Sequence, residues 1–222
     1  MIKKKFKISL HIFYIVIITF CYSIINGEEK NAAFEDGVIY LSTIIANDSL
    51  FNKIDTDLDK VDALYKIAVK YYDGDISEAL LALTFATLPF NKMSAKIPFI
   101  NVRVPLHLPS VNENLFNKKK NNLPGKVLFN STKKHGLDRD KVAHFFGNAF
   151  LSYNISFLNI SKFFGFIVEM FESAFQVSNG VDIRDMQVNY LGEYFGNSLQ
   201  KNSDLKPSDF FKVYSLFYFS YN

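Results

Sequence analysis

The sequence of 222 residues has one cysteine, no tryptophan, and only 16 glycine and proline residues taken together. A single cysteine excludes a disulfide framework and a cysteine-rich zinc module. The scarcity of glycine and proline excludes collagen-like and low-complexity chains. The net charge of +3 is too small to indicate a dedicated nucleic-acid-binding protein, so we expect no nucleic-acid partner.

The chain does contain enough apolar material for a sizeable core. Hydrophobic residues make up 49% of it, and its aromatic residues are 24 phenylalanines and 12 tyrosines. With 21% charged residues it does not have the composition of a disordered chain. Its length suits one domain with an appended segment. Nothing in this composition indicates a particular reaction.

Residues 1–27 have the build of an export signal. Four lysines lie within the first seven residues, and residues 8–25 then run without a charge. A basic head followed by an apolar stretch is typical of a signal peptide, and this stretch is close to the length of a membrane anchor. We therefore expect residues 1–27 to be a signal peptide or an N-terminal membrane anchor, and the protein to be exported to the periplasm or cell envelope.

Three fates of this segment are open. Cleavage before Glu28 is favoured, because Gly27 offers a small residue there; the alternatives are a retained anchor and lipid attachment through Cys21. Lipid attachment ranks last, because the bulky Phe20 stands where a lipoprotein signal has a small residue. Cleavage would remove four lysines and the only cysteine, leaving a net charge of −1. We expect the partner to be a membrane surface or an envelope component.

Residues 28–134 are predicted to be a helical region with an extended arm and a basic loop. Apolar residues at spacings of three and four predict helices over 56–72 and 76–88, capped by Thr56 or Asp57 and by Asp75. Residues 97–109 alternate with period two and contain internal prolines, which indicates an edge strand or extended arm with an exposed His107. The Asn- and Lys-rich residues 112–134 are expected to form a surface loop.

Residues 135–222 are predicted to form a core of three to four helices. Three mainly apolar segments each carry polar or small residues at positions i, i+4, i+7 and i+11, which share one narrow side of a helix. The three series are Asp140, His144, Gly147 and Leu151; Gly165, Glu169, Glu172 and Gln176; and Asp185, Asn189, Gly192 and Gly196. A further aromatic helix is expected at the C-terminus, starting near Pro207.

We expect the three polar edges to face one another. Glycine costs a helix about 1 kcal/mol relative to alanine, so repeated glycines on one edge indicate close backbone packing. The glycines are Gly147, Gly165, Gly192 and Gly196. The polar cluster would then contain Asp140, Lys141, His144, Glu169, Glu172, Asp185 and Asn189.

Such a cluster needs compensation for its buried acids, and three arrangements are open. The favoured one is an ion-paired core in which Lys141 or Arg184 pairs with the acids. The second is a divalent metal held by His144, Glu169 and Asp185, a ligand set that suits Mg, Mn or Ca. The third is acid–base chemistry, with the same three residues as catalytic candidates of an envelope hydrolase.

The spacing of these motifs resembles a known family. Asp140-Lys141-x-x-His144, Gly165-x-x-x-Glu169 and Asp185-x-x-x-Asn189-x-x-Gly192-x-x-x-Gly196 are similar to motifs of the VanZ-like family and of YfiM-type periplasmic lipoproteins. The resemblance covers residues 138–199 approximately. It implies a cell-envelope setting and a shared helical core, and it implies no reaction. Glu172 departs from the family pattern, which tends to have glutamine there.

Residues 142–161 lack Asp, Glu, Lys and Arg, yet their several Asn, Ser and His residues are costly in hydrocarbon. We therefore expect a helix of about 140–153, a polar turn and a second helix from about 161, within a domain outside the bilayer. The predicted fold class is mainly α, a single helical domain with a short extended arm.

Overall fold

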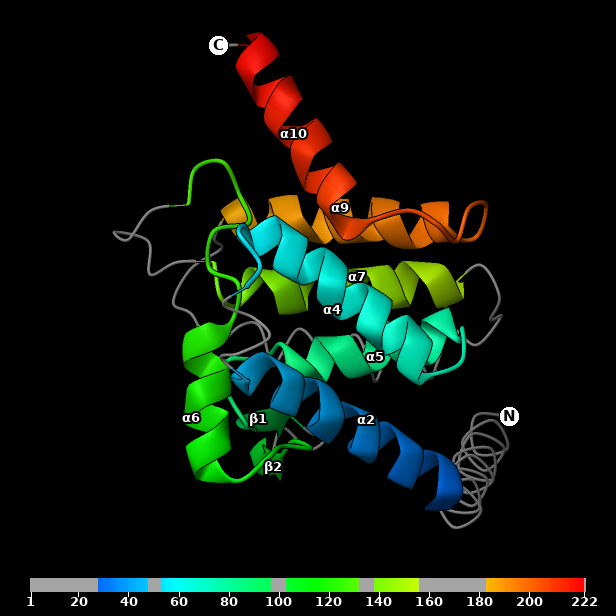
Figure 1. Ribbon diagram of the computed structural model, residues 1–222, viewed down its shortest axis with the longest axis vertical. Helices are drawn as coiled ribbons and strands as arrows, with labels where there is room; N and C mark the ends of the chain where they lie inside the picture. The colour runs from blue at the N-terminus through cyan, green and yellow to red at the C-terminus, as the bar shows by residue number, and fades with distance from the viewer. Residues whose placement is uncertain (1–27, 48–52, 97–102, 132–137, 156–182, 222) are drawn as a thin grey trace, which may run out of the picture. The chain divides into compact units, whose positions relative to one another are not determined.

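The computed structural model describes residues 28–47, 53–96, 103–131, 138–155 and 183–221. Residues 1–36 and residues 37–222 form separate compact units, and the second contains the candidate site. The described part of the chain is mainly helical, as predicted, with seven α-helices and one β-hairpin (Figure 1). The helices are α2 (Glu28–Ala46), α4 (Asp57–Tyr71), α5 (Ile76–Ala86), α6 (Glu113–Asn122), α7 (Lys141–Ile155), α9 (Ile183–Leu199) and α10 (Pro207–Tyr221).

The helices α4 and α5 begin at the caps that the sequence predicts. The Thr56 hydroxyl accepts a hydrogen bond from the Asp59 amide, and the Asp75 carboxylate accepts one from the Glu78 amide. Helix α4 buries one stripe of residues toward the core, whereas α5 is buried on most of its surface. Helix α5 packs between α4 and α7, which explains why its sequence is apolar on nearly all sides.

The predicted extended arm is one strand of an antiparallel hairpin. Strand β2 (Arg103–His107) pairs with β1 (Lys92–Lys96), in a register that sets Lys92 opposite His107 and Ser94 opposite Pro105. His107 is exposed, as expected. Residues 97–102 of the arm lie outside the described residues.

The prediction of a surface loop over residues 112–134 is wrong for its first half, which forms α6. The side chain of Asn112 caps this helix by accepting a hydrogen bond from the Leu115 amide. Lys119 is buried with its ammonium 4.8 Å from the centre of the Phe116 ring, while Lys118 and Lys120 are exposed. A short helix with few apolar residues has no clear periodic pattern, so the polar composition concealed it.

The C-terminal helices meet in an aromatic core. The ring of Phe145 in α7 lies 5.3 Å from that of Phe195 in α9 and 4.7 Å from that of Phe211 in α10. The α10 helix begins at Pro207, as predicted, and its Ser208 donates from both amide and hydroxyl to the Asp62 carboxylate of α4. Among the described helices we find none with the length and apolar character needed to cross a bilayer.

Candidate functional site

Helices α7 and α9 run parallel and touch through their backbones. A Cβ atom at Gly192 would overlap the carbonyl oxygen of Phe145, and one at Gly196 would overlap that of Ala149. One turn further on, the Gln200 side chain donates a hydrogen bond to the Tyr153 carbonyl. Contacts between the two helices therefore recur every four residues along both of them. The close packing predicted for these two glycines is therefore present. Gly147 is buried in α7, and Gly165 lies outside the described residues.

A polar cluster lies where the first turns of α7 and α9 meet. The ammonium of Lys141 lies 2.6 Å from the Asp185 carboxylate and 3.0 Å from that of Asp140. The side chain of Lys141 is only 4% exposed, that of Asp185 is 16% exposed, and that of Asp140 at the rim is 41% exposed. A single buried cation therefore bridges the carboxylate of Asp140, which immediately precedes α7, and that of Asp185 in α9.

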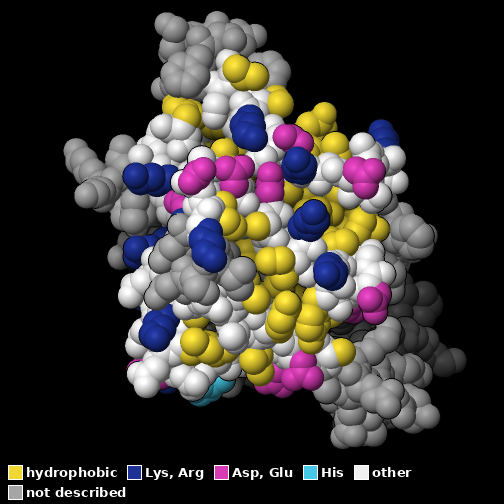
Figure 2. Space-filling model, viewed as in Figure 1, with side chains coloured by type: hydrophobic (Ala, Val, Ile, Leu, Met, Phe, Trp, Pro, Cys, Tyr) yellow, Lys and Arg dark blue, Asp and Glu magenta, His cyan; other side chains and the backbone are white. Residues whose placement is uncertain are grey.

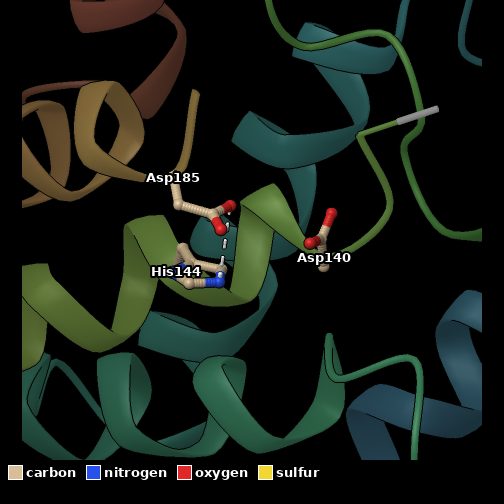
Figure 3. Close-up of side chains that lie close together, drawn as sticks. All are labelled: Asp140, His144 and Asp185. Atoms are coloured by element: carbon tan, nitrogen blue, oxygen red, sulfur yellow. Dashed lines mark ion pairs between the residues drawn. The ribbon is translucent and has the colours of Figure 1, made fainter. Parts of the chain in front are cut away.

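The imidazole of His144 lies between two side chains of α9, those of Asn189 and Asp185. Its Nδ1 atom lies 3.1 Å from the Asn189 side-chain oxygen, which also accepts a hydrogen bond from Asn148. Because that oxygen is an acceptor, the proton of a neutral His144 belongs on Nδ1, and Nε2 faces Asp185 at 3.7 Å. Figure 3 shows the imidazole and the Asp185 carboxylate directed toward each other.

Burial and charge act in opposite directions on the two basic groups. Burial lowers the pKa of His144, although the carboxylate of Asp185 opposes this, so the neutral imidazole is favoured near pH 7. Burial would also lower the pKa of Lys141, but hydrogen bonds and attraction to Asp185 and Asp140 outweigh it and raise that pKa. The cluster thus holds one ammonium, two carboxylates and a neutral imidazole.

A second buried ion pair lies beside the cluster, and the sequence analysis missed its acidic member. Asp138 is fully buried, and its carboxylate lies 2.7 Å from the Arg184 guanidinium. It also accepts hydrogen bonds from the Leu128 amide and the Ser131 hydroxyl. Burial raises the pKa of Asp138 despite the attraction of Arg184. This pair joins the loop before α7 to the first turn of α9.

The structure brings together five of the seven predicted cluster residues, namely Asp140, Lys141, His144, Asp185 and Asn189. Glu169 and Glu172 lie outside the described residues. The side of α7 that contacts α9 also carries Asn148 and Ala149, which the predicted edge did not include. Asn148 stands four residues after His144 in an apolar helix, and that spacing was the available signal for it.

Of the predicted metal ligands, His144 and Asp185 lie together, and Glu169 lies outside the described residues. Asp140, His144 and Asp185 offer ligand atoms that all lie within 4.8 Å of one another. The Lys141 ammonium, however, already lies between the two carboxylates. The arrangement can hold a cation, and in this structure the Lys141 ammonium is that cation.

Two grooves lie away from the cluster, and none of its five residues lines either. A groove of about 970 Å³ between α4 and the α9–α10 connection is lined by aspartates and lysines, and a more apolar one of about 390 Å³ lies between α9 and α10. Figure 2 shows acidic and basic side chains interspersed on the face that carries α4. The charged groove therefore presents both acidic and basic side chains.

Comparison of the chain with protein-family models, with curated proteins and with solved structures finds no match.

Proposed function

We propose that the chain is an exported cell-envelope protein in which the polar cluster joins α7 to α9 and serves no catalytic step. The single observation that supports this role for the cluster is the position of Lys141, whose buried ammonium bridges Asp140 and Asp185. Buried charges are stable when they are paired and hydrogen-bonded. A lysine held in this way lacks the unprotonated amine that a general base or nucleophile requires.

The proposed envelope location is supported by the lysine head and apolar stretch of residues 1–27, and by the motif spacing that resembles the VanZ-like family. The partner we propose is a membrane surface or another envelope component. N-terminal sequencing of the protein purified from its native host is expected to begin near Glu28. An intact Met1 would point to the retained anchor, and recovery in the cytosol would contradict export.

A double-mutant cycle tests the role of the cluster. We expect Lys141→Met and Asp185→Asn each to lower the free energy of unfolding, by up to about 3–5 kcal/mol, because each leaves a buried charge without its main partner. The double variant should lose less than the sum of the two, since it leaves neither charge in place. Urea unfolding measures all three values, with the exposed Asp55→Asn as the control. Additive effects would contradict the proposed ion pair.

Glu169 and Glu172 remain proposed members of the cluster. If Glu169 joins it, Glu169→Gln should change the free energy of unfolding by more than about 0.5 kcal/mol, the usual limit for surface substitutions. The matched control is Glu193→Gln, at an exposed position of α9. Equal effects of the two substitutions would remove Glu169 from the cluster.

A divalent cation site is the second candidate function, and it underlies the alternative of a metal-assisted envelope hydrolase. It is favoured by the orientation of His144, because Asn189 holds Nδ1 and turns Nε2 toward Asp185. Metal-binding histidines are commonly oriented in this way by a partner on the other ring nitrogen. The cation would have to displace the Lys141 ammonium from between the carboxylates.

Metal binding can be separated from the structural role. If the site binds a divalent cation, Mn²⁺ or Zn²⁺ should raise the Tm of the protein, and Lys141→Met should enlarge this rise because it removes the competing ammonium. His144→Ala should abolish the effect. Elemental analysis of the tag-free protein gives an independent reading. An unchanged Tm in both the parent protein and Lys141→Met would exclude the cation site.

A further inference from the structure

The smaller of the two grooves, between α9 and α10, combines apolar walls with a single charged side chain. We call it the apolar groove, and its volume of about 390 Å³ lies within the range of small-molecule pockets. Of the seven described residues that line it, three are aliphatic, three are aromatic and one is Asp209. The aromatic residues are Tyr194, Phe210 and Tyr214. A ligand in this groove therefore meets apolar surface and one negative charge.

The aromatic wall is built by both helices. The rings of Tyr194 in α9 and Phe210 in α10 have their centres 5.2 Å apart and their planes at 69°. Phe210 is buried against Phe195 of the core, which holds its ring in place, whereas Tyr194 is 65% exposed. Tyr214 follows Phe210 by four residues and so lies on the same side of α10. Two rings at this angle form adjacent walls, and aromatic rings attract cations to their faces.

The carboxylate of Asp209 has no ion-pair partner among the described residues. Lys212, three residues later on α10, directs its ammonium to the Ser208 hydroxyl. No basic residue of the described chain lines the apolar groove. The charge of Asp209 is therefore available to a ligand that carries a positive charge.

We propose that the apolar groove binds a small soluble organic cation, namely a quaternary ammonium compound. The methyl groups of such an ion are apolar and pack on the aliphatic and aromatic walls, while its diffuse charge is attracted by aromatic rings and by Asp209. A bare divalent cation does not suit the groove, because calcium takes six to eight oxygen ligands and the groove offers one carboxylate.

The charge of the groove also distinguishes a free quaternary ammonium compound from a phosphocholine lipid headgroup. The phosphate of such a headgroup needs a basic partner, and the described lining offers it only the carboxylate of Asp209, which repels it. The inference does not rest on the role proposed for the polar cluster, because none of the cluster's described residues lines this groove.

A pair of probes that differ only in charge tests the proposal. Choline carries a trimethylammonium group, and its carbon isostere carries an uncharged tert-butyl group of the same shape. Saturation-transfer difference NMR with the full chain detects the methyl protons of either probe. We expect saturable binding of choline that added salt weakens, and an affinity about tenfold lower for the isostere. Equal affinities, no saturable binding of choline, or tighter binding of phosphocholine than of choline would each overturn the proposal.

Variants of the groove locate the bound probe. Asp209→Asn should weaken choline binding about threefold to fivefold, because it removes the charge and keeps the shape. Tyr194→Leu should have a similar effect, whereas Tyr194→Phe keeps the ring and should bind choline like the parent protein. Glu193→Gln, at the exposed neighbouring position outside the groove lining, is the matched control.

Asp209 and Tyr194 are exposed, so these variants should keep the fold, which their Tm values check. An unchanged affinity in both Asp209→Asn and Tyr194→Leu would place the bound choline elsewhere on the protein and would contradict the proposal.

Discussion

Gly192 of α9 lies directly against the backbone carbonyl of Phe145 in α7, with no room for a side chain between them. Gly196 repeats this relationship with Ala149 one turn later. Glycine is unfavourable within a helix, so its presence here reflects a steric need. The spacing of the two helices is set by this contact, and the polar cluster at their first turns depends on that spacing.

Replacement of Gly192 by alanine should separate the two helices. Alanine improves helix propensity by about 1 kcal/mol, yet the overlap with the Phe145 carbonyl can be relieved only by moving backbone. We expect a net loss of about 1–3 kcal/mol in the free energy of unfolding, measured in urea. Asn197→Ala, at an exposed position of the same helix, is the control and should be neutral or slightly stabilising. Equal effects at the two positions would argue against the backbone contact.

The buried pair of Asp138 and Arg184 should matter more than any surface ion pair. Removing the charge of either partner should cost about 3–5 kcal/mol, because the other charge is then buried without compensation. Chemical denaturation of Asp138→Asn and Arg184→Met measures this. The exposed Asp204→Asn serves as the reference and should change stability by less than about 0.5 kcal/mol. A loss as small as that of the reference would contradict the pairing.

Lys119 should give the protein a stability that rises with pH above neutrality. Burial lowers the pKa of Lys119 from 10.5 to about 7, so between these values the folded protein binds fewer protons than the unfolded chain. The free energy of unfolding should therefore increase from about pH 7 toward pH 10, by at most about 1.4 kcal/mol per pH unit for one group. Below pH 7 both states are protonated, and the slope from this group disappears.

The substitution Lys119→Met should flatten this pH dependence and raise stability most near pH 7, because the buried charge is replaced by an apolar chain of similar length. Lys120→Met, at the exposed neighbouring position, should leave the slope unchanged. Urea unfolding at intervals from pH 7 to pH 10 measures both. Parallel curves for the parent protein and Lys119→Met would show that the amine is solvated.

The elements predicted best were those with strong local signals. Thr56 and Asp75 cap helix starts by accepting hydrogen bonds from backbone amides, and Pro207 begins α10 because it has no amide hydrogen to satisfy. The apolar spacing after each of these residues is regular. The polar sequence around Lys119 gave no such signal, because the buried residues of α6 are one phenylalanine, Phe116, and one lysine. Two such residues do not form a periodic apolar pattern. Local patterns therefore predicted the long helices and missed the short polar one.

The candidate site was predicted as far as it depends on helix periodicity. The offsets that link Asp185, Asn189, Gly192 and Gly196 on one side of α9 are local, and all four contact α7. The pairing of Asp138 with Arg184 joins residues 46 positions apart and depends on how two elements pack. The Lys141 ammonium, a predicted member of the cluster, reaches both Asp140 and Asp185, and this bridging position also depends on how the helices pack.

The contact between α7 and α9 also bears on how this protein can change over evolutionary time. The atoms of α7 that meet the two glycines are main-chain carbonyls, which every amino acid possesses, so this part of the contact does not depend on the side chains at positions 145 and 149. The glycines of α9 have no such freedom. Homologous chains should thus be traceable by this pair of small residues even where their charged groups have diverged.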